Sequence, residues 1–193
     1  GSENLCLAGG VALNCVANGI LQREKIFKNV WIQPAAGDAG GALGVALSIW
    51  HKYLGNERKG TEDGRDRQRS SYLGPKFEAD EIRAYLDSIK APYTEYKPGE
   101  TAEAVAEILA DEKVVGLFQG RMEFGPRALG ARSIIGDARS TDMQTTMNLK
   151  IKYRESFRPF APSILQEKIS EYFKQDDIVP FMDKVFEVKK THQ

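Results

Sequence analysis

The chain has 193 residues, with 27 basic and 27 acidic side chains and 41% hydrophobic residues. This composition is typical of a globular protein of one or two domains, and its zero net charge argues against a nucleic-acid coat or a polybasic membrane binder. No apolar run approaches the roughly 20 residues of a membrane span. The N-terminus also lacks a basic flank followed by an apolar stretch. We therefore expect a cytoplasmic protein without membrane contact.

The first 55 residues alternate between strand and helix patterns. Strands are predicted at 3–8 and 30–33, and helices at 11–23 and 39–53. A strand needs a neighbour, and no element precedes the first one. We therefore expect the chain to begin inside a longer protein, unless its first two residues are a cloning remnant.

A charged segment at 56–71 separates this part from the rest and predicts a linker. The sequence therefore predicts an α/β protein with domains at 1–55 and 72–193. The second domain has an extended segment predicted at 159–165. Its strands are predicted at 114–119 and 132–136, and its helices at 80–90, 101–112, 141–150 and 167–174.

Two glycine-rich segments follow the first two predicted strands. The pair Gly9-Gly10 lets the backbone approach a ligand closely, and the amide of Asn14 can face that ligand or cap the next helix. After the second strand, Asp38 can bind a divalent cation or a ribose, or cap its own helix. Because two such strand ends side by side form one crevice, the pair indicates a ligand site.

The most specific pattern lies between residues 120 and 136. Arg121, Arg127 and Arg132 stand among glycines and apolar residues, where Glu123 can balance one of their charges. Partly buried guanidinium groups need anionic partners, because an unpaired buried charge costs several kcal/mol. The pattern indicates a site for a polyanionic ligand, and the alternative is a structural cluster of salt bridges.

A second basic stretch follows at 148–163. Between residues 121 and 158, eight basic side chains stand against four acidic ones. Such a local surplus suits a nucleotide or phosphoryl substrate. The interleaved Tyr153, Phe157 and Phe160 leave a rival hypothesis, in which the stretch clamps single-stranded RNA.

Four stretches together closely resemble the nodulation-type and antibiotic-tailoring O-carbamoyltransferases. They read LAGGVALN at 7–14, GDAGGALG at 37–44, GRMEFGPRALG at 120–130 and FRPFAPS at 157–163. The resemblance implies a truncated actin-like ATPase piece, β-α-β-α in form, at 1–55. It implies a YrdC-like mixed α/β domain at 72–193.

The resemblance also implies a reaction. Such proteins use ATP, with Mg²⁺, to convert carbamoyl phosphate into carbamoyl adenylate, and then transfer the carbamoyl group to a hydroxyl of a sugar or other small acceptor. The intact proteins hold an iron-type metal, of whose ligands this chain supplies Asp38; His51 and His192 do not match the family's upstream histidine pair. We therefore expect an incomplete metal site and transfer step, and the missing N-terminal half as partner.

Roles follow from the same resemblance. The catalytic residues are expected to be Arg121, Lys152 and Arg158. The phosphates of carbamoyl phosphate and ATP are expected to contact Arg127, Arg132, Ser133, Asn148, Arg154 and Ser163. The nucleotide pocket is expected to contain Gly9, Gly10 and Asn14.

Two further expectations concern an alternative function and self-association. The alternative function is a non-catalytic RNA-binding or folding-only module of a larger protein, against which the neutral net charge argues. We also expect the isolated chain to associate through apolar surface on residues 1–50.

Overall fold

The computed structural model describes residues 1–60, 68 and 71–192. The chain forms two compact units, and each is assembled from separate stretches of sequence. The bounds of these units differ from those of the domains predicted at 1–55 and 72–193, which stay a prediction, and most of the predicted linker lies outside the described residues. Unit 1 consists of Gly1–Gly74, Glu123–Leu129 and Ser163–Gln193, and unit 2 consists of Pro75–Met122 and Gly130–Pro162.

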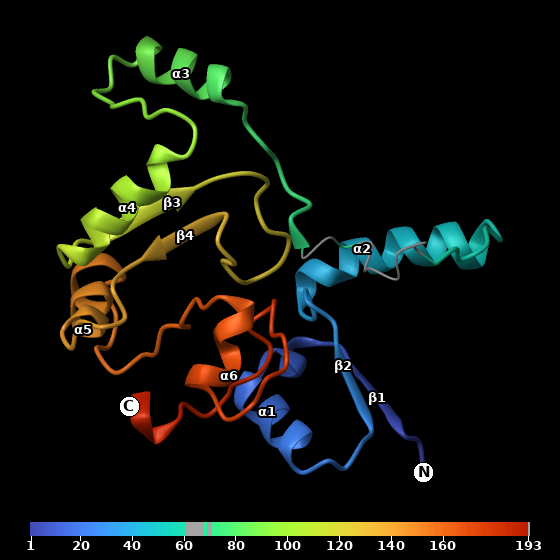
Figure 1. Cartoon of the computed structure of the whole chain (residues 1–193). Helices are drawn as coiled ribbons and strands as arrows, with labels where there is room; N and C mark the ends of the chain where they lie inside the picture. Colours follow the sequence, from blue (N-terminus) through green and yellow to red (C-terminus); the bar gives the residue numbers. More distant parts are fainter. Residues whose placement is uncertain (61–67, 69–70, 193) are drawn as a thin grey trace. The chain divides into compact units, whose positions relative to one another are not determined.

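Unit 1 is built around a β-α-β motif. The strands β1 (Asn4–Leu7) and β2 (Asn29–Ile32) pair in parallel, and α1 (Cys15–Arg23) lies between them in sequence (Figure 1). Parallel strands need a crossover connection, which a helix commonly supplies. The small core at this sheet consists of Ala12, Ile32 and Ala36, with Leu7, Leu13 and Val30 packed against it.

The helix predicted at 11–23 is divided in the structure. A 3₁₀ turn covers Gly10–Leu13, and α1 begins only after Asn14. The Oδ1 atom of Asn14 accepts a hydrogen bond from the amide of Ala17 at 3.1 Å. An asparagine side chain that bonds the backbone in this way favours a helix start over a helix interior, so the helix begins here.

The end of the chain packs on α1 within unit 1. The side chain of Asn18 is 2% exposed, and its Nδ2 donates to the carbonyl oxygens of Ala12 at 2.8 Å and Asp183 at 2.9 Å. A Cβ built on Gly19 would lie 2.9 Å from the carbonyl oxygen of Val185. Glycine at this position therefore allows the close approach. The helical stretch predicted at 167–174 is present as a 3₁₀ turn at Gln166–Lys168 followed by α6 (Ile169–Tyr172).

A long apolar helix follows β2. The helix α2 (Asp38–Ser48) continues into a π-helical turn at Ile49–Tyr53, as the prediction of one helix at 39–53 requires (Figure 1). Neither segment contains a buried residue. Of the helices in the described part of the chain, none is long and apolar enough to cross a membrane.

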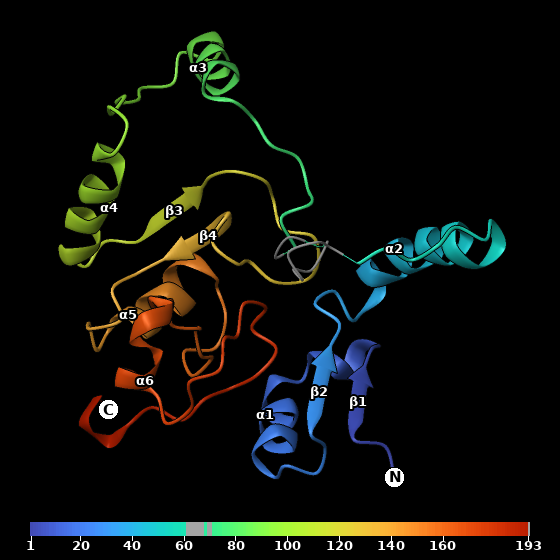
Figure 2. The same cartoon turned by 45° about the vertical axis from the view of Figure 1, so that its right-hand side comes forward.

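Unit 2 contains two helices, a two-stranded antiparallel sheet and a further helical segment, close to their predicted positions. The strands β3 and β4 pair with Phe118 opposite Arg132, and α4 contacts β3 (Figure 2). The helix α5 continues into a π-helical turn at Met147–Ile151. The bounds are α3 (Ala79–Ser88), α4 (Glu100–Ala110), β3 (Val115–Phe118), β4 (Arg132–Ile135) and α5 (Met143–Thr146).

Local signals explain two of these elements. The helix α3 starts with a capping box, in which the Glu78 and Glu81 side chains each accept from the other residue's backbone. At the end of β4, a Cβ on Gly136 would lie 2.7 Å from the sulfur of Met143, so glycine lets α5 pack directly on the strand end. The prediction of a mixed α/β protein is confirmed, and the actin-like and YrdC-like assignments stay predictions.

Candidate functional site

The two glycine-rich stretches meet in unit 1. The amide of Gly9 donates to the carbonyl oxygen of Ala36 at 2.7 Å, which joins the segment after β1 to the segment after β2. Gly9 has a φ of 95°, a conformation that L side chains rarely adopt. A Cβ built on Gly9 or Gly10 would meet no atom within 4 Å, so the backbone there faces open space. The structure thus brings together the two strand ends that the sequence predicted to be adjacent.

Asn14 and Asp38 both lie at helix starts. Asn14 caps α1, and Asp38 is the exposed first residue of α2, where its negative charge interacts favourably with the helix dipole. Asn14 thus has the capping role that the sequence left open, whereas Asp38 does not cap its helix, because Gly37 is the N-cap of α2. Among the described residues, no group of three or more His, Cys, Asp or Glu side chains is placed to hold a metal. A metal-binding role for Asp38 stays a prediction.

The Arg-rich motif is divided between the two units. Its central residues, 123–129, form a loop of unit 1. The Oε1 atom of Glu123, a residue only 8% exposed, accepts a hydrogen bond from the amide of Leu129 at 2.6 Å. Gly125 has a φ of 123°, and a Cβ there would lie 3.3 Å from that of Ala35. The loop therefore lies directly against the segment between β2 and α2.

Arg127 extends from this loop toward the glycine-rich stretches. It is half-buried, and its Nη2 donates to the carbonyl oxygen of Leu13 at 3.3 Å. No ion pair within the described ranges of the chain involves Arg127. Leu13 lies between Gly10 and Asn14 in sequence, so the structure places Arg127 with the predicted nucleotide-binding residues.

In unit 2, Arg132 and Ser133 hold the ends of the β3–β4 pair. The Nη1 atom of Arg132 donates to the carbonyl oxygens of Gln119 and Ala131, both at 2.9 Å, and its guanidinium carbon lies 3.5 Å from the Phe118 ring centroid. The Oγ atom of Ser133 accepts from the amide of Gly130 at 2.9 Å. These contacts are local to the hairpin. A phosphate contact for either residue stays a prediction, as it does for the exposed Arg121 of the same unit.

The basic segment, defined here as residues 150–158, carries four cations and one carboxylate. The carboxylate, Glu155, pairs with Arg158 at 2.9 Å. A backbone hydrogen bond at Glu155 and the Arg158 guanidinium lower the pKa of this carboxyl, which keeps it ionised. Lys150 and Lys152 are exposed, and the half-buried Arg154 lies 5.0 Å from the Phe160 ring centroid. The segment thus has a net positive charge.

Asn148 lies beneath the basic segment and is 0% exposed. Its Nδ2 donates to the carbonyl oxygens of Ser156 at 3.0 Å and Arg158 at 2.7 Å, and its Oδ1 accepts from Nε of Arg154 at 2.7 Å. Burial separates this side chain from solvent, although the sequence predicted that it contacts phosphate. The only sequence signal for burial is an uncharged amide flanked by Met147 and Leu149.

Two further residues do not join this segment: Ser163, a predicted phosphate contact, and Arg139, one of the eight basic residues counted between 121 and 158. Ser163 is exposed and belongs to unit 1, whereas the basic segment belongs to unit 2. Arg139 donates to both carboxylate oxygens of Asp137, at 2.9 and 2.7 Å, and lowers the pKa of Asp137 to about 2. The Asp137–Arg139 pair therefore neutralises itself and adds no charge to a ligand site.

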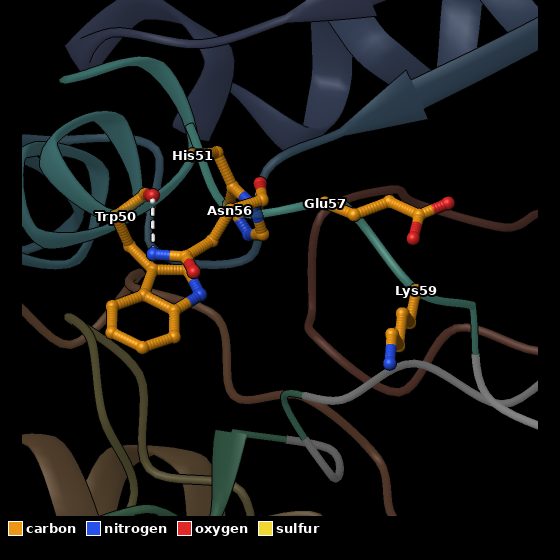
Figure 3. Close-up of a pocket in the computed structure, with 5 residues that line it drawn as sticks. All are labelled: Trp50, His51, Asn56, Glu57 and Lys59. Atoms are coloured by element: carbon orange, nitrogen blue, oxygen red, sulfur yellow. Dashed lines mark hydrogen bonds between the residues drawn. The ribbon is translucent and has the colours of Figure 1, made fainter. Parts of the chain in front are cut away.

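A hollow of about 440 Å³ lies at the π-helical turn after α2, lined by Trp50, His51, Asn56, Glu57 and Lys59 (Figure 3). Nδ1 of His51 lies 2.8 Å from the carbonyl oxygen of Asn56, so this nitrogen carries the proton in that bond. The Nδ2 atom of Asn56 donates to the carbonyl oxygen of Trp50 at 3.1 Å. None of the predicted site residues lines this hollow.

Comparison with known families gives two matches to the chain. The carbamoyltransferase N-terminus model matches residues 1–47, and the carbamoyltransferase C-terminus model matches residues 106–193. The chain belongs to the carbamoyltransferase family. The first match contains both glycine-rich stretches, and the second contains the Arg-rich motif and the basic segment.

Several curated proteins resemble the chain along nearly its whole length. An uncharacterized protein of Synechocystis is 62% identical over 98% of this chain and 31% of its own length. Nodulation protein NolNO of Sinorhizobium fredii is 42% identical over 99% of this chain and 28% of its own length. Nodulation protein NolO of Bradyrhizobium diazoefficiens is 40% identical over 99% of this chain and 34% of its own length. The chain thus spans about a third of these relatives.

Proposed function

We propose that the chain contributes to ATP-dependent O-carbamoyl transfer. In this function carbamoyl phosphate and ATP, with Mg²⁺, give carbamoyl adenylate, whose carbamoyl group passes to a hydroxyl of a sugar or other small acceptor. Membership of the carbamoyltransferase family supports the transfer. The intact relatives are about three times as long as the chain. We therefore assign the acceptor pocket to sequence that corresponds to the remaining parts of these relatives. We also propose that the protein is located in the cytoplasm.

The observation that carries the proposal is the basic segment held over a buried asparagine. The whole chain is neutral, yet residues 150–158 carry four cations and one carboxylate. Three hydrogen bonds from the Asn148 side chain tie this segment to the unit. Catalysis on phosphates depends mostly on positioning and on neutralising charge, and a pre-ordered group of cations supplies both.

The proposed chemistry needs no covalent nucleophile from the protein. Water first hydrolyses carbamoyl phosphate to carbamate and inorganic phosphate. An oxygen of this carbamate attacks the α-phosphorus of ATP, and the bond to pyrophosphate breaks. Arg121, Lys152 and Arg158 neutralise the negative charge that the reacting phosphates carry. The acceptor hydroxyl then attacks the carbamoyl carbon, and AMP leaves. The described residues do not fit an iron-type metal site, so no step is assigned to such a metal.

Gly9, Gly10 and Arg127 form the second part of the proposal. The open backbone at the two glycines can approach a nucleotide, and the half-buried Arg127 guanidinium beside them can bind its phosphate. Asn14 uses its Oδ1 atom as a helix cap, so its Nδ2 atom is the group assigned to the nucleotide.

One observation favours a second candidate function. The side chains of Tyr153 and Phe157 are 86% and 77% exposed between the cations of the basic segment. Exposed rings between basic residues can stack on the bases of single-stranded RNA. RNA binding of this kind would weaken steeply with added salt and would not respond to carbamoyl phosphate.

Calorimetric titration of the chain with ATP and Mg²⁺, with and without carbamoyl phosphate, tests the proposal. We expect Arg121→Ala and Lys152→Ala each to weaken binding at least about tenfold, since charge-assisted hydrogen bonds are lost. Lys113→Ala is the matched control, because Lys113 is an exposed cation of unit 2 paired with Asp111. Absence of binding by a folded chain, or an equal loss in the control, would contradict the proposal.

A further inference from the structure

We propose that Asn148 is a positioning residue, which holds the basic segment in the conformation that binds phosphate. The inference rests on the proposed function, because it assumes that Lys152, Arg154 and Arg158 contact the phosphates. It replaces the direct ligand contact that the sequence predicts for Asn148.

The π-helical turn sets the position of Asn148. The amide of Lys152 donates to the carbonyl oxygen of Met147 at 2.9 Å, five residues earlier. Single π-helical turns are rare and occur frequently at functional sites. Met147 is 4% exposed and Asn148 is 0% exposed. The turn therefore buries the carboxamide at the point where the basic segment begins.

Four hydrogen bonds connect Asn148 to the segment. The side chain donates to the carbonyl oxygens of Ser156 and Arg158 and accepts from Nε of Arg154. The carbonyl oxygen of Asn148 accepts from the amide of Arg154 at 3.0 Å. A carboxamide has donors at one end and an acceptor at the other, so a single asparagine satisfies both kinds of partner.

The backbone between these bonds is strained. Tyr153 has a φ of 50°, in the left-handed region that non-glycine residues rarely adopt. Its side chain is 86% exposed, so packing of the ring does not hold this conformation. Strained residues persist where the surrounding structure over-determines them. The bonds of Asn148 to Arg154, one residue later, supply that constraint.

The same bonds leave Arg154 able to bind an anion. Asn148 uses only the Nε nitrogen of this guanidinium, and Nη1 and Nη2 can still donate in parallel to two oxygens of one phosphate. The Phe160 ring lies against the guanidinium at 5.0 Å. Arg154 is thus oriented from two directions before any ligand arrives, which reduces the entropy lost on binding.

The test compares Asn148→Ala with a matched core variant, Met143→Ala. Met143 is 5% exposed in the same unit and contacts Gly136, so its truncation destabilises the unit without removing a bond to the basic segment. Three quantities are measured for each variant of the 193-residue chain. They are the affinity for ATP with Mg²⁺, the amide hydrogen-exchange rates of residues 152–158, and the midpoint of thermal unfolding.

We expect Asn148→Ala to weaken ATP binding at least about tenfold and to speed exchange at the Arg154 amide. Met143→Ala should lower the unfolding midpoint and leave the affinity unchanged at temperatures where it is folded. Asn148→Asp provides a second variant of equal size. It keeps the acceptor for Arg154 but sets an oxygen against the carbonyls of Ser156 and Arg158, and it should also weaken binding.

Equal losses of affinity in Asn148→Ala and Met143→Ala would overturn the proposal, since Asn148 would then act only through stability. Unchanged affinity in both Asn148 variants would overturn it as well. If the unsubstituted chain binds no ATP, the proposed function fails, and the phosphate-binding part of this inference fails with it. Exchange at residues 152–158 then still decides whether Asn148 orders the segment.

Discussion

Asp183 is an ionisable residue at which burial opposes the charge. Its Oδ1 atom is buried and has no hydrogen-bond partner in the described part of the chain. Burial raises the pKa of this carboxyl above its usual value. The neighbouring bond from Asn18 goes to the backbone carbonyl of Asp183 and so does not compensate the carboxylate.

We predict that Asp183→Asn stabilises the chain at neutral pH by up to about 1 kcal/mol, because it removes the charge from a partly buried carboxyl whose Oδ1 atom has no partner among the described residues. The folded state binds the Asp183 proton more tightly than the unfolded state does. The destabilisation by ionised Asp183 is therefore absent below the pKa of about 3.9 that the carboxyl has in the unfolded state. It develops as the pH rises through the higher pKa of the folded state.

Urea denaturation at pH 7 and at a pH below 4 measures this difference. Asp176→Asn is the control, because Asp176 is exposed and close by in sequence. A variant that is no more stable than the original chain at pH 7 would contradict the assignment of Asp183 as a destabilising carboxylate.

Residue-level roles were only partly predictable. The sequence correctly offered helix capping as one role for Asn14, because the residue type and its place after a glycine turn are local signals. The carbonyl partners of Arg132 and Asn148 were not foreseen. Those partners lie up to 57 residues away and are set by how the chain turns back on itself, which residue type alone does not encode.

At the scale of elements, α2 provides a sharp contrast between two glycines. A Cβ on Gly40 would lie 2.1 Å from the carbonyl oxygen of Ala35, whereas a Cβ on Gly44 would meet nothing within 4 Å. Both residues lie inside the same helix. The first glycine allows the segment after β2 to approach the helix, whereas no atom of the described residues packs at the second.

We therefore predict opposite effects of two identical substitutions. Gly40→Ala should destabilise the chain by about 2 kcal/mol or more, since a backbone atom must move. Gly44→Ala should stabilise it by up to about 1 kcal/mol through helix propensity. Chemical denaturation of both variants checks this prediction, and a stabilising Gly40→Ala would show that the contact with Ala35 is not part of the fold.

The element positions themselves were largely predictable. The strands and helices occur close to where hydrophobic periodicity placed them, because that period reports which face of a segment is apolar. The π-helical turns at Ile49–Tyr53 and Met147–Ile151 were not predicted. Each π-helical turn contains one residue more than an α-helical turn, which shifts the following side chains around the helix. A stretch of five residues is too short for this shift to show in the hydrophobic pattern of the sequence.

For the whole molecule, α2 and its π-helical turn expose several large apolar side chains. Val45, Leu47, Ile49 and Trp50 are between 44% and 61% exposed. A helix that is apolar on all sides is ordinarily buried, so this surface favours association.

We predict that the chain self-associates at micromolar concentrations and that Val45→Lys with Leu47→Lys shifts it toward the monomer. Sedimentation velocity over a concentration series measures the change. A double lysine substitution at the exposed Ser88 and Tyr85 of α3 is the charge-matched control. A monomer at every concentration in the unsubstituted chain would contradict the prediction.

The sequence by itself determined the elements and the family, because periodicity and short motifs depend on neighbours in the chain. Only the tertiary structure decided that the Arg-rich motif divides between two units, with Arg127 beside the glycine-rich stretches and Arg132 within the hairpin. It also decided that Asn148 is buried. The physical reason is that the donor of Arg127 and the acceptor of Leu13 are 114 residues apart, and packing alone brings such groups together.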